Sequence, residues 1–318
     1  MRQFVNAGTP MTIEVIGVDG SSWTVSGSAQ GHEGVVLDAG PQGLQEAPRS
    51  GVWQQSAFQE GATFMGVSVE PIDLVLAFQI WGDEENWQDV SSRFRRAFDY
   101  ERPATLRVDT ESGTRELEVV LFEAPDRNTD VDGRVLQYSV ETYTLRAAWP
   151  FWADSVEVST VEGGLVPRPE EGTPEWDALP DVVRRLFEME GGFDSFFSGS
   201  VTVSNPTDVP LWPQWALTAP GRWAVPDHSF KDDDQANRFI MTPTLYPGEG
   251  LTIDTYPRNE PYVAENGSNM AGRFGGVLFL NPIPPFTQPT EIPVSYIGDD
   301  IDAAGTVRMR RYYNGPWG

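Results

Sequence analysis

The sequence predicts a mainly β protein in two parts: an N-terminal sheet with one packed helix and a hairpin, and a C-terminal β-sandwich of the jelly-roll kind. The 318 residues include 11 Trp, 17 Phe, 31 Gly and 26 Pro, a composition typical of strands joined by tight turns. Apolar and polar residues alternate in many short runs, as they do in half-buried strands. A Pro-, Gly- and Glu-rich segment separates two such regions, which predicts a domain boundary there.

The N-terminal domain is expected to span residues 1–152 and to open with a hairpin. Thr12–Val18 forms the first alternating run, a Gly/Ser turn follows, and a second strand begins at Trp23. A long, charged, Gly-rich excursion then continues to about Gln59. After it we expect a pair of strands, ATFMGVSVE and IDLVLAFQIWG, which hold the most hydrophobic sequence of this half.

One helix is predicted in this half, over DEENWQDVSSRFRRAFDY. Asp83 is a good N-cap residue, and acidic residues in the first turn complement the positive end of the helix dipole. Four apolar residues recur at helical spacing on one face, which predicts a stripe that packs on a sheet rather than a ligand site. These residues are Trp87, Val90, Phe94 and Phe98.

A second hairpin and a long strand complete the N-terminal domain. Two alternating runs flank Ser112-Gly113, and the segment GRVLQYSVETYTLRAAWPFW reads as one further strand that closes on Trp149-Pro150-Phe151-Trp152.

Residues 153–198 are expected to be a linker with a short helical insert, at about 165–192. Thr173 would cap the helix, Pro174 suits the first helical position, and Gly191-Gly192 would end it. The C-terminal domain then spans 199–318, where eight short strands in about 120 residues predict the sandwich.

Charge and composition exclude several classes of function. The chain has 47 acidic and 22 basic residues, a formal charge of −25, so it resists the phosphate contacts that dominate DNA binding and is not expected to bind a specific nucleic acid sequence. It has no cysteine, and hence no disulfide and no cysteine-based metal site. Without a signal peptide or an apolar run of membrane-spanning length, we expect synthesis in the cytoplasm and no membrane insertion.

We expect no enzyme activity, no catalytic residue, no metal and no cofactor. The two histidines, His32 and His228, lie in different predicted domains, whereas a zinc site usually needs three or four ligands. Acidic pairs are too numerous to indicate a glycosidase without geometry. The acidic runs Asp232–Asp234 and Asp299–Asp302 lack the spacing of a calcium-binding loop and are expected to be solvated.

A carbohydrate-binding or receptor-binding module is the alternative function. Trp212, Trp215 and Trp223 of the sandwich could stack on sugars, although a place in the core or at a subunit contact is favoured for them. Asn266-Gly267 is interpreted as a turn rather than as a glycosylation acceptor.

The order of these pieces resembles the distal tail protein, or minor tail protein, of long-tailed (siphovirus-type) bacteriophages over nearly the whole chain. The most specific parts are the aromatic-Pro-aromatic junction at 149–152, the Asn–Asp–Pro segment at 205–210 that begins a strand, and Ile253-Asp254-Thr255. The longer helical insert departs from the family pattern.

The resemblance implies a structural role in the virion, at the tail tip. The N-terminal domain, a split barrel in fold, would build a hexameric ring through its sheet and hairpin, and a galectin-like C-terminal sandwich would point outward. Such a ring would join the tail tube to the hub or baseplate and let DNA pass. The implied partners are further copies of the chain, the tail tube protein, the hub or baseplate protein and the tape measure protein.

Overall fold

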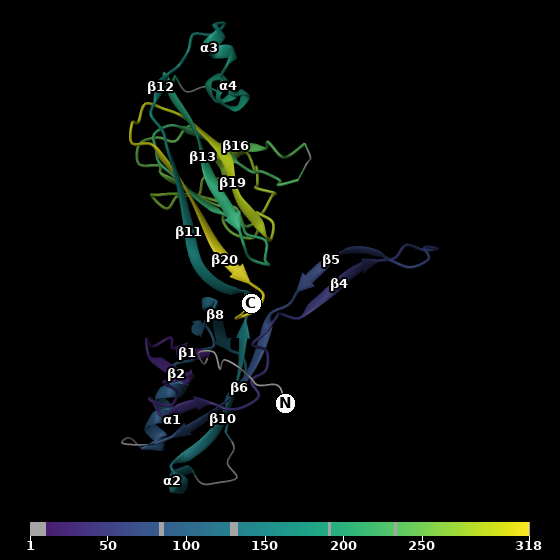
Figure 1. Cartoon of the computed structure of the whole chain (residues 1–318), viewed down its shortest axis with the longest axis vertical. Coiled ribbons are helices and arrows are strands. Elements are labelled where there is room, and N and C mark those ends of the chain that lie inside the picture. Colours follow the sequence, from purple (N-terminus) through teal and green to yellow (C-terminus); the bar gives the residue numbers. More distant parts are fainter. Residues whose placement is uncertain (1–10, 83–85, 128–132, 190–191, 232–233, 318) are drawn as a thin grey trace, which may run out of the picture. The chain divides into compact units, whose positions relative to one another are not determined.

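The computed structural model describes residues 11–82, 86–127, 133–189, 192–231 and 234–317. The chain divides into two compact units (Figure 1): unit 1 is Met1–Asp154 together with Tyr313–Gly318, and unit 2 is Ser155–Tyr312. The chain therefore passes between the units twice. Most elements are antiparallel β-strands, which confirms the mainly β prediction. The assignment of separate domains to 1–152 and 199–318, with a linker at 153–198, stays a prediction.

Unit 1 is built on an antiparallel sheet in the order β2-β1-β7-β8-β10-β6-β3, with β9 paired to β10. Along the longest ladder, ten residues of β6 pair with ten of β10. The predicted hairpins at Thr12–Val18 and around Ser112-Gly113 are present as β1–β2 and β7–β8. The strands are β1 (Thr12–Ile16), β2 (Ser22–Ser26), β3 (Val35–Leu37), β6 (Ile72–Trp81), β7 (Ala104–Thr110), β8 (Gly113–Leu121), β9 (Asp126–Arg127) and β10 (Tyr138–Ala147).

Helix α1 (Trp87–Arg96) lies on this sheet. The predicted N-cap, Asp83, lies outside the described residues, and the structure caps the helix with Asn86, whose side chain accepts a hydrogen bond from the backbone N–H of Gln88 at 3.1 Å. The stripe that the spacing predicts is buried in the core of unit 1: Trp87, Val90, Phe94 and Phe98.

Three predictions for unit 1 are wrong. The segment before β10 begins as a helical turn, α2 (Gly133–Leu136), and not as a strand; Gly133 packs on the Trp87 ring with no room for a side chain. The excursion before Gln59 contains a strand, β4 (Arg49–Gln54), which pairs with β5 (Thr63–Val69). The expected pairing of β5 with β6 does not occur, since β6 pairs with β3 and β10 instead.

Unit 2 is a β-sandwich. One sheet has the order β12-β13-β19-β15-β16, and the other runs β18-β17-β14-β20-β11. Phe197 and Trp223 of the first sheet share a core with Trp215, Ile253 and Val307 of the second. The strands are β11 (Trp152–Glu162), β12 (Val166–Pro167), β13 (Ser195–Asn205), β14 (Gln214–Leu217), β15 (Arg222–Pro226), β16 (Phe239–Met241), β17 (Leu251–Asp254), β18 (Tyr262–Ala264), β19 (Thr287–Ile297) and β20 (Ala304–Tyr313).

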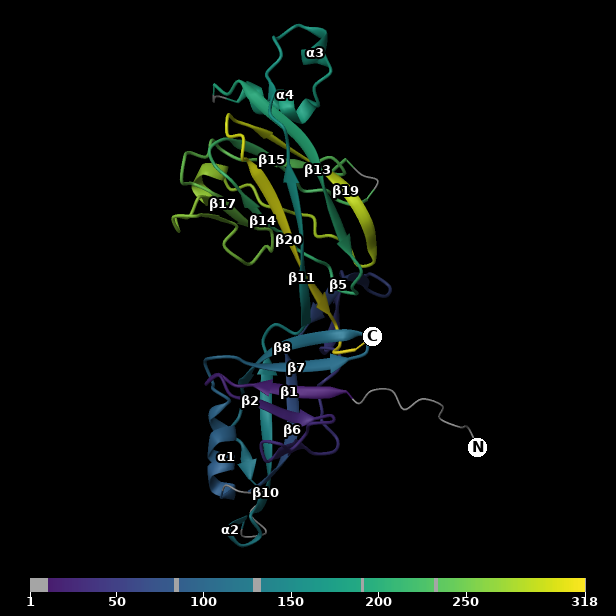
Figure 2. The same ribbon diagram turned by 60° about the vertical axis from the view of Figure 1, so that its left-hand side comes forward.

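Two short helices, α3 (Pro174–Asp177) and α4 (Asp181–Glu188), form an insert in unit 2 next to the start of β13 (Figure 2). Thr173 caps α3 as predicted, and its hydroxyl accepts a hydrogen bond from the N–H of Trp176. The expectation of one helix from this cap to Gly191-Gly192 is wrong, since α3 ends at Asp177 and α4 begins after Pro180, which lacks the N–H that a continuous helix would need. Of the glycine pair predicted to end the insert, Gly191 lies outside the described residues. The remainder of 153–198 is therefore largely regular structure, with β11, β12 and the beginning of β13 on either side of the helices.

Candidate functional site

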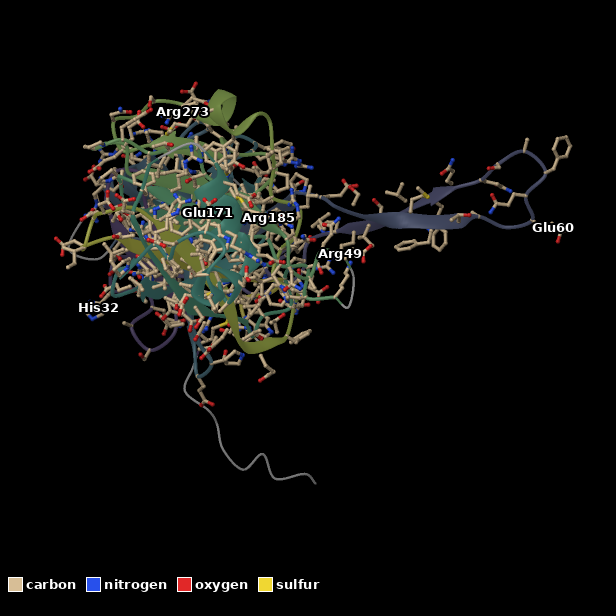
Figure 3. The ribbon with its side chains drawn as sticks, turned by 90° about the horizontal axis from the view of Figure 1, so that it is seen from above. His32, Arg49, Glu60, Glu171, Arg185 and Arg273 are labelled. Carbon is tan, nitrogen blue, oxygen red and sulfur yellow. The ribbon has the colours of Figure 1, made fainter. Side chains whose placement is uncertain are left out.

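A two-stranded hairpin is the most unusual surface of unit 1. We call residues 49–69 the arm: it consists of β4, β5 and the turn between them, and it forms a sheet of its own. Figure 3 shows it as a separate ribbon, with Arg49 at its base and Glu60 at its tip. All side chains of β4 are exposed. An isolated hairpin is only marginally stable in water. The arm therefore contributes little to the stability of the single chain, and another role is needed to explain it.

The arm has an apolar face and a more polar face. Trp53 pairs with Phe64, and their rings meet edge to face with centroids 5.1 Å apart. Val67 and Val69 lie on the same face of the ribbon, since paired residues and residues two apart share a face. These side chains are 62%, 53%, 54% and 37% exposed, in that order. The other face carries Ser50, Val52, Gln54, Thr63 and Ser68.

The tip of the arm carries a strained aromatic residue. Phe58 is fully exposed and has a φ of 69°, a left-handed conformation that costs a residue other than glycine about 1 kcal/mol or more. Strained backbone is often kept for function. An exposed Phe in this conformation therefore points to a contact with another molecule.

The arm is electrically neutral in a chain of charge −25. Residues 49–69 contain one arginine, Arg49, and one acidic residue, Glu60. Arg49 is held at the base, where its guanidinium donates to the side-chain oxygen of Asn314. Because the arm adds no net charge, it can approach another strongly acidic molecule without the repulsion that the remainder of the surface would meet.

The tryptophans proposed for carbohydrate contact do not gather on a surface. Trp215 is 1% exposed and Trp223 is fully buried, and both belong to the core of the sandwich. Neither can stack on a sugar without leaving that core. Trp212 is half-buried, with its ring edge to face on Tyr256.

The histidines lie in different units. His32 is exposed, and His228 contacts the Ala236 carbonyl through Nδ1 and packs on Phe230. Over the described residues, no group of three or more His, Cys, Asp or Glu residues is arranged to hold a metal ion. Over the same residues, no helix has the length and apolarity needed to cross a membrane.

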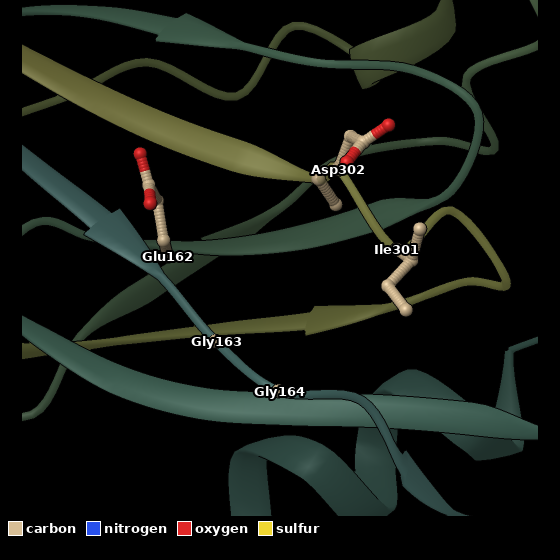
Figure 4. A pocket seen from close by; sticks show the side chains of 6 residues that line it. Glu162, Gly163, Gly164, Ile301 and Asp302 are labelled. Carbon is tan, nitrogen blue, oxygen red and sulfur yellow. The ribbon is translucent and has the colours of Figure 1, made fainter.

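The predicted acidic loops have different outcomes. Asp232 and Asp233 lie outside the described residues. Asp302 lines a surface pocket of about 430 Å³, together with Glu162 and Gly163-Gly164, and Figure 4 shows the two carboxylates on separate elements. Asp300 accepts a hydrogen bond from the N–H of Asp302 within its own turn.

The residues that carry the family resemblance hold loops of unit 2 in place. The Asn205 side chain is fully buried: its amide donates to the carbonyls of Val209 (2.9 Å) and Ile283 (3.1 Å), and its oxygen accepts from Thr207. Asp254 ends β17 and accepts from Gln214 across the sheet at 2.8 Å. The turn predicted at Asn266-Gly267 is present, with Gly267 at a φ of 80°.

Relatives of this chain are found among bacteriophage proteins, although no protein-family model matches it. The chain is 30% identical over 336 residues to the minor tail protein Gp27 of Mycobacterium phage D29, a match that covers 98% of this chain and 99% of the relative. The chain belongs to the bacteriophage minor tail proteins. A second minor tail protein Gp27, from Mycobacterium phage L5, is 29% identical over 346 residues, with 98% and 99% covered.

The fold of this minor tail protein is similar to that of the SPP1 Dit (gp 19.1) protein, which is described as a paradigm of the hub adsorption apparatus of phages that infect Gram-positive bacteria. The TM-score is 0.55 at 10% identity, with 95% of this chain and 98% of the other covered. The family predicted from the sequence is thereby confirmed, and the solved structure supports the fold.

Proposed function

We propose that this minor tail protein is a structural, non-catalytic component of the phage tail tip. Copies of the chain assemble into a ring, of six in the simplest reading of the family resemblance, that joins the tail tube to the hub or baseplate. The observation that carries the proposal is the exposed, neutral arm with its apolar face. The protein would reside in the virion after synthesis in the host cytoplasm.

A second copy of the chain is the binding partner that best suits the arm. Two bodies of charge −25 repel one another, and the neutral arm is the part of unit 1 that can bridge them with least repulsion. An arm that docks on a different surface of the next copy makes a head-to-tail contact, and such contacts close into rings when the rotation allows. Covering its apolar face would also stabilise a hairpin that is marginal alone.

The ring would serve as a passage for DNA. Six copies would carry a formal charge of 6 × −25 = −150, and a lumen lined by part of that charge would not hold the phosphate backbone, whereas charge on the outer surface alone would leave the lumen neutral. The proposed neighbours are the tail tube protein, the hub or baseplate protein and the tape measure protein. Neutralising acidic residues of the lumen should slow DNA ejection, and ejection at an unchanged rate would count against this passage.

The arm can be tested by electron microscopy of the purified chain. We expect negative-stain images to show rings with a central hole, and the mass in solution to match them. The double variant Trp53→Ser/Phe64→Ser should weaken association by about 3 kcal/mol, on the order of a hundredfold, because two large apolar side chains would lose their cover.

Val52→Ser is the matched control, since Val52 is 49% exposed on the opposite face of the same hairpin. Its rings should persist. Equal loss of rings in both variants would mean that the hairpin is needed only for folding. If the Trp53→Ser/Phe64→Ser variant self-associates as strongly as the wild type, the arm does not form the contact between copies.

A further inference from the structure

Unit 2 carries an arginine-containing face on the outer side of one sheet. Along β20, Thr306, Arg308 and Arg310 alternate with the buried residues Val307 and Met309, so the three point outward. Both arginines are exposed. Neither makes an ion pair with another described residue, although acidic residues outnumber basic ones two to one in this chain.

The neighbouring strands extend this face. Thr160 of β11 contacts Thr306 through its hydroxyl oxygen at 3.3 Å, which places the outward residues of β11, Val156 and Val158, on the same side. These valines are 49% and 55% exposed. On the other side Gln214 of β14 lies directly opposite Arg308. We call Val156, Val158, Arg308, Arg310 and Gln214 the arginine face. It combines arginines with exposed apolar side chains, as protein-binding surfaces do, and the Asp254 carboxylate, which accepts from Gln214, lies at its edge.

An acidic surface lies on the other sheet of the same unit. Phe197, Trp223 and Tyr296 belong to the sandwich core, while their sequence neighbours Phe196, Ala224 and Ile297 pack on α4. The insert therefore covers the outer side of the five-stranded sheet. Three of its exposed carboxylates, on Glu170, Glu175 and Asp177, make no ion pair with a described residue.

We propose that the arginine face of one copy docks on the acidic insert of the next copy. The two surfaces are opposite in charge and belong to opposite sheets of one unit, so the contact is head-to-tail and repeats from copy to copy. Charge complementarity favours a second copy of this chain as the occupant. The contact would be a second link between copies, outside the arm, and it rests on the proposed assembly of this protein into a ring.

Reversing the charges on the arginine face and on the insert, first separately and then together, tests whether these two surfaces bind each other. Arg308→Glu/Arg310→Glu and Glu175→Arg/Asp177→Arg should each weaken self-association about tenfold or more in sedimentation velocity, because like charges would face each other. The combined variant should regain most of the loss. The control Arg96→Glu/Arg102→Glu makes the same change in charge on exposed residues of unit 1 and should have a small effect. Failure of the combined variant to recover would overturn the pairing.

Cross-linking separates this contact from the proposed ring. Since the chain has no cysteine, Thr306→Cys/Ala178→Cys introduces one thiol beside the arginine face and one on the insert. A short bis-maleimide reagent should join copies into a series of cross-linked oligomers, seen as a ladder of bands on a denaturing gel. The variant Thr306→Cys/Ser92→Cys, with its second thiol on α1, should give no such ladder. Rings without a ladder would overturn this contact and leave the arm proposal standing. A ladder without rings would overturn the arm proposal and leave this contact standing. The absence of both the ladder and the rings would overturn the two proposals together.

Discussion

Buried polar side chains of this minor tail protein position loops. Asn205 fixes the segment before β14 by hydrogen bonds to two carbonyls and to Thr207. Two tyrosines act similarly at other loops: Tyr262 donates to the Val277 carbonyl at 2.6 Å, and Tyr296 donates to the Pro220 carbonyl at 2.6 Å. Such bonds cost little when satisfied and are expensive to leave unmade, which explains polar groups in a core without chemistry.

The same two tyrosines predict a loss of stability at alkaline pH. Burial raises the pKa of Tyr262 and of Tyr296 to about 12, from an ordinary value of 10.0. The unfolded chain then releases these protons first as the pH rises. The contribution to stability is therefore complete below pH 10 and is lost between about pH 10 and pH 12.

Urea unfolding followed by tryptophan fluorescence at pH 9 and pH 11 measures the effect. Each tyrosine should account for a fall of about 1 kcal/mol in the free energy of unfolding over that interval. In Tyr262→Phe/Tyr296→Phe the fall should be smaller, although the variant starts lower because two hydrogen bonds are missing. A pH dependence identical to that of the wild type would show that other groups cause it.

At the scale of elements, the periodicity of apolar residues predicted those strands and helices that have one buried and one exposed face. β1, β2, β7 and β8 alternate clearly because one face of each strand meets the core. The stripe of α1 was visible for the same reason. β4 was missed because all of its residues are exposed and its partner, not a core, holds it extended. α2 was missed because a helix of four residues is too short to show a helical period in the sequence.

The candidate site was correspondingly hard to predict. Residues 50–59 form an uncharged run in a chain of which 22% is charged, and this was the available indication of the arm. The tryptophans of the sandwich attracted attention instead, but aromatic residues fill cores as often as they line surfaces. Only burial separates Trp53, which is 62% exposed, from Trp223, which is 0% exposed.

The helical insert allows a prediction at this scale. Leu186 of α4 is fully buried against the outer side of the sheet, so Leu186→Ala should lower the free energy of unfolding by about 2–5 kcal/mol through the cavity that it leaves. Arg185→Ala, an exposed change in the same helix, should stay within about 0.5 kcal/mol of wild type. Denaturant titration compares them, and similar stabilities would mean that α4 is only loosely attached.

At the scale of the whole molecule, unit 1 is completed by residues from after unit 2. Arg115 of β8 is 4% exposed and donates to the carbonyl of Gly315 at 2.7 Å, with its guanidinium 3.6 Å from the centre of the Tyr313 ring. Unit 2 is thus inserted into the chain of unit 1. Patterns along the sequence could not indicate this return, since the residues that meet are 200 positions apart.

Deletion of residues 313–318 should therefore destabilise unit 1 rather than unit 2. We expect a loss of about 3 kcal/mol or more in unit 1, because a buried charge loses two of its partners. Hydrogen exchange by mass spectrometry resolves the two units, and faster exchange should appear in β7 and β8. Deletion of 317–318 alone keeps the contacts of Arg115 and should change little. Unaltered protection after the longer deletion would mean that these contacts contribute no stability.

This return of the chain has a consequence for timing during translation. The whole of unit 2 leaves the ribosome before residues 313–315 emerge. Unit 2 can therefore fold before Arg115 makes its contacts with Tyr313 and Gly315. The tie between Arg49 and Asn314 at the base of the arm forms at the same late moment. Nascent chains on one messenger RNA thus carry arms whose base is not fixed until Asn314 has been made, and we expect them to become competent to assemble only after that point.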